Sequence, residues 1–414
     1  MGIKNLSALL NSKCQMAINK RNLVNYSGMI MGIDISIFLY KYLYNNDDHL
    51  EGITRLFLRI LKNGIVPFVI FDGKPPKEKG DVLEDRKEKR DILEIKKNIM
   101  ENIIKQNLKK EETQKKNNDE IKNEIKEFIK NSKRESFEID NEELNELLQK
   151  NEKEINEEIE KTDKRIIYVT SKHIESTKNL CQYFGIPFIV SKGEAESLLG
   201  HLCREEILDG CISEDTDVLV NGGKIFLRSV CADKNAVDEY CLEGIMTALD
   251  VNYNEFIDIC ILCGCDYTTK INGMGPLNAH KVIKKYKTIE VFKEACENKK
   301  EKYIIPDGFD FIRARELFNT SSKDDNRDEI KNIMKMSIPK ITELRELLKE
   351  TKLHKKYFDE IDRNLMEYYK NIRRNNINNV MNEEFEDKDE KIIKKIKKDT
   401  TNNKKITDFF VKKE

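Results

Sequence analysis

The sequence has no run of about 18 apolar residues, so it predicts no transmembrane helix. The residues after Met1 and Gly2 lack a signal-peptide core, and Leu6 stands where a myristoylation signal requires Ser or Thr. The formal net charge is only −1, so binding to nucleic acid would have to rest on local basic patches. We therefore expect a protein that does not contact membranes.

The ten cysteines lack the regular spacing of a disulfide-rich secreted domain, which indicates a reducing compartment. Cys260, Cys263 and Cys265 lie close together and could bind a metal. They fall in the apolar stretch FIDICILCGCDY, so we interpret them as buried free thiols.

One long stretch lacks glycine, between Gly80 and Gly185, and proline is missing from a slightly wider range. In residues 101–160, 30 of 60 positions are Asp, Glu, Lys or Arg. Apolar residues recur there at helical spacing, so we predict two or three long helices that project from the rest of the fold. Residues 135–160 carry eleven acids against two lysines, which argues against contact with nucleic acid in that segment.

On either side of this stretch, apolar strands alternate with helices. Strands are predicted at 29–33, 65–71, 165–170, 188–190, 211–212 and 224–227. Helices are predicted at 37–44, 53–61, 171–184, 242–263 and 340–374. This alternation is typical of an α/β fold with a mainly parallel sheet, whose functional residues gather where the strands end.

Acidic residues stand where predicted strands or helices end. They are Asp34, Asp72, the pair Glu194 and Glu196, the pair Asp215 and Asp217, and Asp266 before a Gly-x-Gly turn. Carboxylates brought close together repel one another unless cations neutralise them, and all-oxygen ligand sets suit Mg²⁺ or Mn²⁺. Two divalent ions, which can clamp the attacking and leaving oxygens of a phosphodiester, explain the whole set economically. The alternative is a set of ordinary surface acids near helix N-termini.

The spacing within each pair adds a condition. Residues i and i+2 point to the same side of an extended chain but nearly oppose each other on a helix. We therefore predict non-helical backbone at Asp215 and Asp217, and a helix's entry turn at Glu194 and Glu196, after Gly193.

Motifs along the chain resemble those of the flap endonucleases, in the structure-specific 5′-nuclease (xeroderma pigmentosum G) family. They are MGIKNLSALL, GIDISIFLY around Asp34, VIFDGKPP around Asp72, GEAES, SEDTDVL and LCGCDYTTKINGMGP. The resemblance covers residues 1–90, 165–320 and the last ten residues. It implies a PIN-like α/β fold with a central, mainly parallel sheet flanked by helices. The charged insertion 91–164 would form a helical arch up to about residue 130, and its acidic remainder has no counterpart in the family. A helix–two-turn–helix DNA-binding region would lie at about 266–290 within 165–374.

The family's metal ligands correspond to the strand-end acids. Asp34, Asp72, Glu194 and Glu196 match the ligands of a first ion, and Asp215 and Asp217, with Glu196 shared, match those of a second. Asp266, with Glu194, would act through bound water. The resemblance therefore implies two Mg²⁺ ions per site, with Mn²⁺ as a substitute.

Three basic residues follow the acid at 72. Lys79 and Arg86 match the family's catalytic pair that holds the scissile phosphate, and with Arg90 their spacing predicts one face of one helix. The alternative is a solvated basic face. Tyr40 matches the aromatic residue on which the family stacks a base beside the cut, and its alternative role is that of a core tyrosine.

The glycines Gly273 and Gly275 match the turn of the helix–two-turn–helix. Glycines let backbone approach a phosphate, which the following helix N-terminus binds. In the family a K⁺ ion bridges this turn and DNA. Lys281, Lys284 and Lys285 add charge that is independent of DNA sequence.

Residues 375–414 are rich in Asn and Lys, and we predict disorder there. Within them, 403–410 resembles the sliding-clamp binding motif. Ile406, Phe409 and Phe410 would form a three-pronged plug on one helical turn, with Asn403 in place of the usual Gln. The alternative is a tail that packs back on the body of the protein.

The resemblance implies a 5′ flap endonuclease with 5′–3′ exonuclease activity in DNA replication and repair. The partners would be flapped or branched DNA and a sliding clamp. We expect a monomer in the nucleus, or at a cytoplasmic replication site if the protein is viral. The alternatives are an exonuclease or repair-incision nuclease of the same superfamily, and a non-catalytic DNA-binding scaffold.

Overall fold

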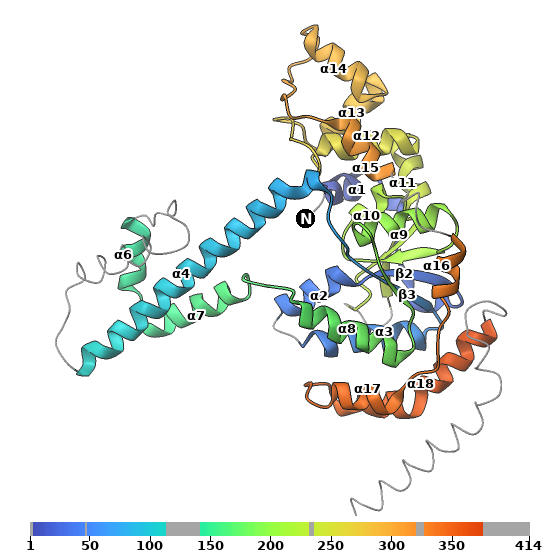
Figure 1. The fold of residues 1–414 in the computed structure, drawn as a ribbon. Coiled ribbons are helices and arrows are strands. Elements are labelled where there is room, and N and C mark those ends of the chain that lie inside the picture. Colours follow the sequence, from blue (N-terminus) through green and yellow to red (C-terminus); the bar gives the residue numbers. More distant parts are fainter. Residues whose placement is uncertain (1–2, 46–47, 113–140, 232–235, 320–326, 376–414) are drawn as a thin grey trace, which may run out of the picture. The chain divides into compact units, whose positions relative to one another are not determined.

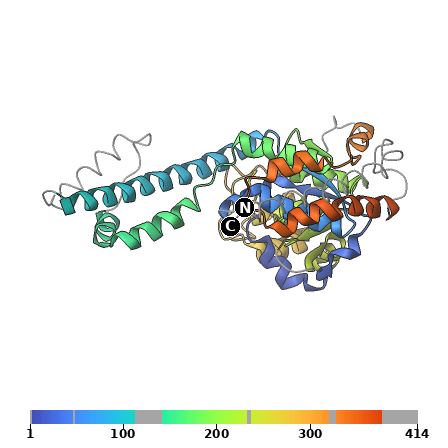
Figure 2. The same ribbon diagram turned by 90° about the horizontal axis from the view of Figure 1, so that it is seen from below.

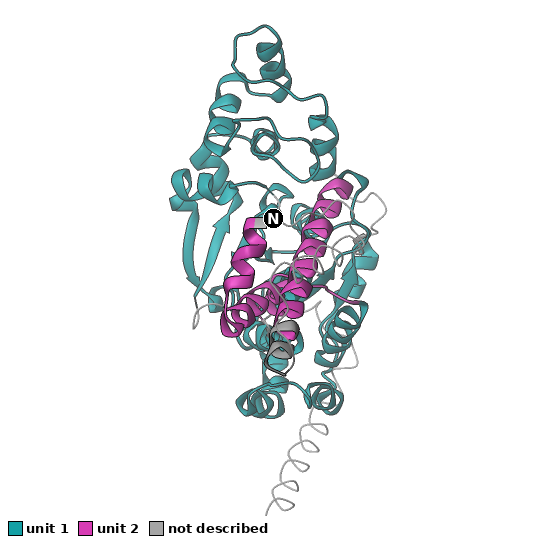
Figure 3. Cartoon of the chain, turned by 90° about the vertical axis from the view of Figure 1, so that its left-hand side faces the viewer, with its two compact units in different colours: residues 1–39, 48–78, 171–414 teal, residues 40–47, 79–170 magenta. Residues whose placement is uncertain are grey.

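The structure, a computed structural model, describes residues 3–45, 48–112, 141–231, 236–319 and 327–375. Contacts divide the chain into two compact units, drawn in teal and magenta in Figure 3. Residues 1–39, 48–78 and 171–414 form the first, here called the sheet unit. Residues 40–47 and 79–170 form the second, here called the arm unit. Among the described residues, no helix is both long enough and apolar enough to cross a membrane.

The sheet unit contains a seven-stranded sheet in the order β1-β7-β6-β5-β2-β3-β4. The strands are β1 Ile18–Asn22, β2 Ile30–Asp34, β3 Val66–Phe71, β4 Phe188–Val190, β5 Gly210–Ile212, β6 Ile225–Arg228 and β7 Ala236–Cys241. The five strands from β6 to β4 run parallel, and β7 and β1 add an antiparallel edge. The prediction of a mainly parallel sheet is therefore confirmed, although the sequence interpretation missed β1 and β7.

Strands β2 and β3 form the middle of the functional edge. Residues 31–34 and 66–71 are buried, as expected for parallel strands that are covered on both faces. In the register of the pair, Asp34 lies opposite Ile70, so Asp72 follows just past the end of β3. Both strands therefore deliver an acid to the same edge of the sheet.

Helices cover the sheet on two sides. The bounds are α1 Leu6–Lys13, α2 Ile35–Tyr44, α3 His49–Lys62, α8 Ser171–Phe184, α9 Ala195–Arg204, α10 Asp217–Val220, α11 Leu242–Leu249, α12 Tyr253–Cys263, α13 Pro276–Tyr286, α14 Ile289–Glu297, α15 Phe311–Asn319, α16 Arg327–Ile333, α17 Ile341–Leu348 and α18 Lys355–Asn375. On one side, α17 and α18 lie against α8 and α3 (Figures 1 and 2). The Tyr369 hydroxyl donates a hydrogen bond to the Phe184 carbonyl and joins these two helix pairs.

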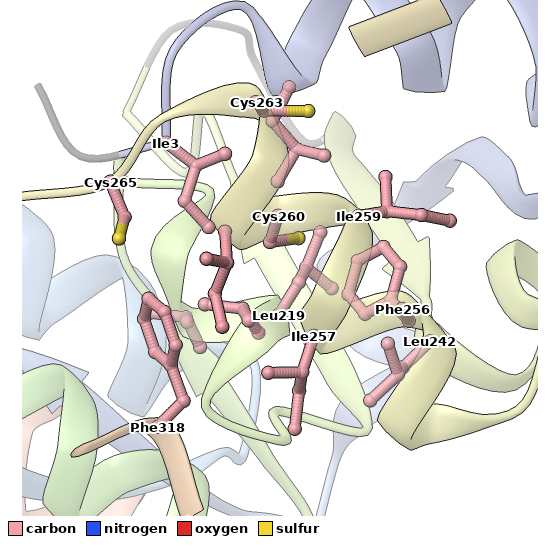
Figure 4. Close-up of a cluster of buried hydrophobic side chains, with 14 of the residues drawn as sticks. Ile3, Leu219, Leu242, Phe256, Ile257, Ile259, Cys260, Cys263, Cys265 and Phe318 are labelled. Carbon is pink, nitrogen blue, oxygen red and sulfur yellow. The ribbon is translucent and has the colours of Figure 1, made fainter. Parts of the chain in front are cut away.

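On the other side, α9 packs on β2, β3 and β5, and α12 packs on α10, α13 and α15. Figure 4 shows Cys260 and Cys263 of α12 among apolar side chains, with Ile3 and Phe318 close by. Burial raises the pKa of Cys263 to about 12, so its thiol stays protonated at neutral pH. The prediction that Cys260, Cys263 and Cys265 are buried free thiols is confirmed.

Three predicted elements differ in the structure. The predicted strand at 165–170 is wrong, because this segment pairs with none of the seven strands of the sheet. The predicted helix 242–263 is divided into α11 and α12, since Asp250 adopts a left-handed conformation with φ 54° and Asn252 caps α12. Residues 340–374 likewise form two helices, α17 and α18.

The arm unit contains α4 Gly80–Glu112, α6 Asn141–Gln149 and α7 Glu152–Asp163. Its core of buried side chains joins all three helices: Ile95, Ile99, Met100, Ile103, Leu144, Leu147 and Ile155. Charged pairs surround the core, with Lys96 Nζ 2.5 Å from Glu143 Oε1 and Lys97 Nζ 2.6 Å from Asp163 Oδ1. The acidic segment therefore folds onto α4 instead of standing alone in solvent, and α4 and α7 lie side by side in Figures 1 and 2.

Candidate active site

Asp34 and Asp72 stand at the ends of the two central strands. Asp34 is 6% exposed, and its carboxylate accepts hydrogen bonds from Ser213 Oγ at 3.2 Å and from the Ile37 N–H at 3.4 Å. Asp72 Oδ1 accepts a hydrogen bond from the Ala195 N–H at 2.8 Å. Residues from four separate segments thus meet at this edge of the sheet.

Asp215 and Asp217 follow β5, beside Asp34. Ser213 Oγ accepts the Asp215 N–H at 3.1 Å, so one hydroxyl contacts both of these acidic segments. Asp217 donates its N–H to Asp215 Oδ1 at 3.2 Å, and its own Oδ1 accepts the Ile3 N–H at 2.8 Å. The prediction of non-helical backbone is wrong for Asp217, which is the first residue of α10. The pair stays together because an N–H at a helix start binds a carboxylate.

Glu194 and Glu196 lie where α9 begins. Glu194 is the N-cap residue, with extended backbone, and Glu196 lies in the first turn, which confirms the predicted helix entry. Tyr267 donates its hydroxyl to Glu194 Oε2 at 2.6 Å. Burial, together with the negative charges of Glu196 and Glu194, raises the pKa of Tyr267.

Asp266 stands next to Tyr267 and belongs to the same acidic region. Burial raises the pKa of Cys265 to about 11, and the charges of Asp217 and Asp266 add to that rise. The structure therefore brings all of the sequence-predicted metal ligands into one neighbourhood of the sheet unit.

The acids repel one another in this arrangement. Burial, followed by the negative charge of Asp72, raises the pKa of Asp34 to about 7, and Asp215 adds to the rise. A carboxyl group with such a pKa lies in a region that lacks positive charge, so a cation would be stabilised there. The donor set consists of carboxylate oxygens, which fits Mg²⁺ or Mn²⁺.

The side chains are not arranged as a finished ligand shell. Across the described ranges, no three Asp, Glu, His or Cys side chains are grouped as the ligands of one ion. The contacts of Asp72 and Asp217 explain this, because their carboxylate oxygens face the N–H groups of Ala195 and Ile3. The donors are carboxylate oxygens that lie near one another, so their chemistry and their proximity fit a divalent ion.

The basic residues Lys79, Arg86 and Arg90, and also Tyr40, belong to the arm unit. Lys79 ends the 3₁₀ turn Lys77–Lys79 and α4 begins after it, so the predicted single helix face holds only for Arg86 and Arg90. The Arg90 guanidinium lies 5.1 Å from the centroid of the Tyr168 ring. Tyr40 is 39% exposed, which disfavours the alternative of a buried core tyrosine.

The range predicted for the helix–two-turn–helix, about 266–290, covers the turn after α12, all of α13 and the start of α14. Gly273 has φ 75°, and Gly275 is the N-cap of α13, with Pro276 as the first helical residue. A Cβ atom added at either glycine would meet nothing within 4 Å, so their backbone is open to a ligand.

Lysines of α13 line the same region, and two of them are paired with acids. Lys284 binds Asp250, and Lys285 Nζ lies 2.8 Å from Glu301 Oε1. Lys281 is exposed. Each ammonium group has three N–H donors, so Lys284 and Lys285 can keep these partners and still donate to a phosphate.

Sequence reasoning missed two side chains that organise the acids, Ser213 and Tyr267. Each lies within two residues of a predicted ligand, and this closeness was the signal available. The predicted clamp-binding residues Asn403, Ile406, Phe409 and Phe410 lie outside the described residues.

Comparison with known proteins identifies the family. Residues 1–92 match the XPG N-terminal domain, and residues 185–266 match the XPG I-region. Flap endonuclease 1 of Cryptosporidium parvum is 30% identical, over 84% of this chain and 67% of that protein. Flap endonuclease 1 of Micromonas commoda is 30% identical, over 77% of this chain and 74% of that protein. The chain belongs to the flap endonuclease family.

As a member of that family, the chain is a structure-specific nuclease. It spans only 54% of Flap endonuclease 1 of Plasmodium knowlesi, to which it is 30% identical.

Solved structures of such nucleases share the fold. The catalytic core of Rad2 in complex with DNA substrate has a TM-score of 0.61 and 20% identity, over 88% of this chain and 100% of that one. Flap endonuclease-1 from Methanococcus jannaschii has a TM-score of 0.51 and 18% identity, over 86% and 96%. The Holliday junction-resolving enzyme GEN1 in complex with product DNA and Mg²⁺ has a TM-score of 0.52 and 15% identity, over 90% and 78%. The PIN-like fold predicted from the sequence is confirmed.

Proposed function

We propose that this flap endonuclease hydrolyses DNA at the base of 5′ flaps and trims 5′ ends, using two Mg²⁺ ions. The observation that carries the proposal is the gathering of acids around Asp34, whose pKa is raised to about 7 by burial and by the charge of Asp72. Such a cluster is destabilising by itself and is relieved by cations.

Asp34, Asp72, Glu194 and Glu196 would hold one ion. Asp215 and Asp217 would hold the other, with Asp266 acting through water. When bound, such ions stabilise the charge that develops on a phosphodiester during hydrolysis, and Mn²⁺ supplies the same chemistry. The GEN1 complex with product DNA and Mg²⁺ supports the proposal by analogy of fold.

The remaining residues orient the acids and bind DNA. Ser213 fixes Asp34 relative to the segment of Asp215 through its two hydrogen bonds, and Tyr267 fixes Glu194. Lys79 and Arg86 would stabilise the negative charge on the scissile phosphate. Tyr40 would stack on a base beside the cut, and Arg90 would contact the DNA backbone.

The helix–two-turn–helix would bind the duplex. The open backbone at Gly273 and Gly275 supports approach by phosphate, and Lys281, Lys284 and Lys285 would add charge. A K⁺ ion at this turn is part of the proposal, and a structure of GEN-1 with potassium (TM-score 0.51, 15% identity, over 89% of this chain and 78% of that one) supports it by analogy of fold.

A sliding clamp is the proposed protein partner, bound through Asn403, Ile406, Phe409 and Phe410. Because Asn reaches less far than Gln, we expect weaker binding than a Gln-containing motif would give. The basic residues Lys404, Lys405, Lys412 and Lys413 would steer the tail to an acidic clamp surface. These roles belong to replication and repair in the nucleus. Titration of a peptide of residues 398–414 against the cognate clamp tests the motif.

Cleavage of a labelled 5′-flap duplex in Mg²⁺, with EDTA as the control, tests the proposal. We expect a product cut at the flap base in Mg²⁺ and none in EDTA. A duplex with a recessed 5′ end and no flap tests the exonuclease alternative, because only an exonuclease activity would shorten it. Equal retention of DNA with no cleavage in Mg²⁺ or Mn²⁺ would instead support a non-catalytic scaffold.

A further inference from the structure

A pocket of about 360 Å³ lies in the sheet unit, next to Glu194 at the start of α9. The mechanism proposed above uses two of its lining residues, Glu194 and Tyr267, and gives the others no role. Its other lining residues include Lys74, Pro76, Lys192, Ser197, His201 and Leu317. A pocket of this size falls in the range of sites that hold small ligands, roughly 300–1,000 Å³.

Two loops form the polar wall and hold each other in place. The Gly73 N–H donates to the Gly193 carbonyl at 2.8 Å, and the Lys74 N–H donates to the Lys192 carbonyl at 3.3 Å. A Cβ atom on Gly73 would lie 1.8 Å from the Ser191 carbonyl oxygen, so only glycine permits this approach. The loops therefore bring Lys74 and Lys192 to the same pocket from well-fixed backbone.

The opposite wall is apolar. Leu198 and Tyr267 are buried, and Leu317 of α15 is half-buried. The Tyr267 ring packs edge-on against Phe318, with 5.1 Å between the centroids, while its hydroxyl binds Glu194. These side chains give the pocket an apolar side, on which Tyr267 is held both through its ring and through its hydroxyl.

The charges around the pocket favour an anion. The lining includes two lysines, Lys74 and Lys192, and one carboxylate, that of Glu194. The hydroxyl of Ser197 adds a group that can donate to phosphate oxygen. A ligand that satisfies both walls combines a phosphate with a flat, partly apolar ring system.

We propose that this pocket binds a single deoxynucleotide that carries a phosphate. The phosphate contacts Lys74 and Lys192, and the base packs against Leu198 and Leu317. The inference rests on the proposed function, because trimming of 5′ ends releases such nucleotides and a one-nucleotide flap ends in one. In both cases the chemistry of the ligand is the same.

Calorimetric titration of the full chain with dAMP in EDTA tests the pocket without any cleavage. We expect saturable binding, no comparable binding of deoxyadenosine, and at least tenfold weaker binding by the double variant Lys74→Ala and Lys192→Ala. Lys20→Ala, which removes an exposed lysine on β1, is the matched control and retains the affinity. Leu317→Trp should fill the apolar side and abolish binding of dAMP. Its melting temperature, compared with that of the parent protein, checks that the variant is folded.

Absence of saturable binding overturns the proposal, as does equal affinity of the double lysine variant. If dAMP binds with the expected pattern while Mg²⁺ supports no cleavage, the pocket stands and the proposed function fails. If cleavage is normal and dAMP does not bind, only the pocket fails.

Cleavage assays identify the source of the nucleotide. If the pocket takes the released product, dAMP inhibits cleavage and the double lysine variant relieves that inhibition. If it takes the end of a short flap, the variant slows cleavage of one-nucleotide flaps more than of long flaps. If a variant has lost its affinity for dAMP and shows neither of these two effects, the pocket has no role in the reaction.

Discussion

The acid site and the arm are held together by different kinds of contact. Asp34 is 6% exposed, and its hydrogen bonds come from Ser213 and Ile37, on separate elements. In the arm, apolar side chains of α4, α6 and α7 pack together, and the charged pairs around them are exposed, with the Asp163 side chain 44% accessible. Exposed pairs contribute little to stability, whereas a buried polar group that loses its partner costs more. Because clustered acids repel one another without cations, we expect substitutions at the acids to change chemistry more than folding. Substitutions in the apolar core of the arm should first change folding.

The sharpest form of this contrast is removal of a carboxylate. As a proposed metal ligand Asp72 acts on the reaction, whereas phosphate contacts supply affinity, so Asp72→Ala should lower single-turnover cleavage of a 5′ flap by at least about a thousandfold while flap binding stays within a few-fold. Asp217→Ala should do the same. Glu346→Ala, at an exposed acid near the end of α17, serves as the control. Near-normal turnover of either variant in Mg²⁺ would remove that residue from the site.

The arm side of the contrast is tested at Ile99, which is fully buried against α6 and α7. Ile99→Ala should destabilise the arm by about 2–5 kcal/mol, the usual cost of a large-to-small change in a core. Limited proteolysis should then cut residues 80–163 faster, with little change in the rest of the chain. Glu146→Ala, at an exposed position of α6, should leave the cleavage pattern as it was.

Lys79 and Arg86 are exceptions to the expected difference between the two units. They belong to the arm unit, but their proposed role is in catalysis. Lys79→Ala and Arg86→Ala should each slow the chemical step by about a hundredfold, because a charge near the phosphate is typically worth several kcal/mol in the transition state. Rapid-quench single-turnover rates and equilibrium DNA binding, measured together, decide this. If only the dissociation constant changes, both residues merely position phosphate.

Ser213 tests the role of a hydrogen-bonding residue in the sheet unit. Ser213→Ala removes a hydroxyl that binds both Asp34 and the Asp215 segment, which should cost about 1 kcal/mol, or roughly fivefold in activity. More Mg²⁺ should be needed for half-maximal cleavage and for the rise in melting temperature that Mg²⁺ produces. Ser213→Thr keeps the hydroxyl and should restore both values. A purely structural residue would not change the Mg²⁺ dependence.

The smallest effect is expected at the ion pair of Lys97 with Asp163. Lys97→Ala should change arm stability by less than about 1 kcal/mol, and the effect should shrink in high salt, because exposed charges are screened. Urea unfolding of the variant at low and high salt measures this. A loss comparable to that of Ile99→Ala would mean that charge, not apolar packing, holds the arm together.

Patterns along the chain predicted that the acids of the candidate site lie near one another. Asp34, Asp72, Glu194 and Asp215 each follow an apolar strand, and in a parallel sheet such ends must share an edge. The contacts that turn Asp217 toward the Ile3 N–H could not be predicted, because they join residues 214 positions apart.

The arm was harder to predict for a physical reason. Its composition predicts long exposed helices, and α4 is one. That Leu144 and Ile155 pack on α4 depends on how the chain folds back, and helical spacing alone cannot supply this. Strand β7 was missed because its sequence AVDEYC mixes acids with apolar residues, which are stabilised there by pairing with β1 and β6.

The hydrogen bond from Ser213 to Asp34 spans 179 residues of sequence, and β5 pairs with β2 over a similar distance. A ribosome that adds about 5–20 residues per second therefore needs roughly ten to thirty-five seconds between making the two acids' segments. During most of that interval the nascent chain holds β2 and β3, but neither β5 nor β4, the strands that pair with their two edges, has been synthesised. The two groups of acids thus cannot meet on the ribosome until β5 and the residues after it have emerged, and an mRNA cut short before β5 would encode a fragment that lacks Asp215 and Asp217.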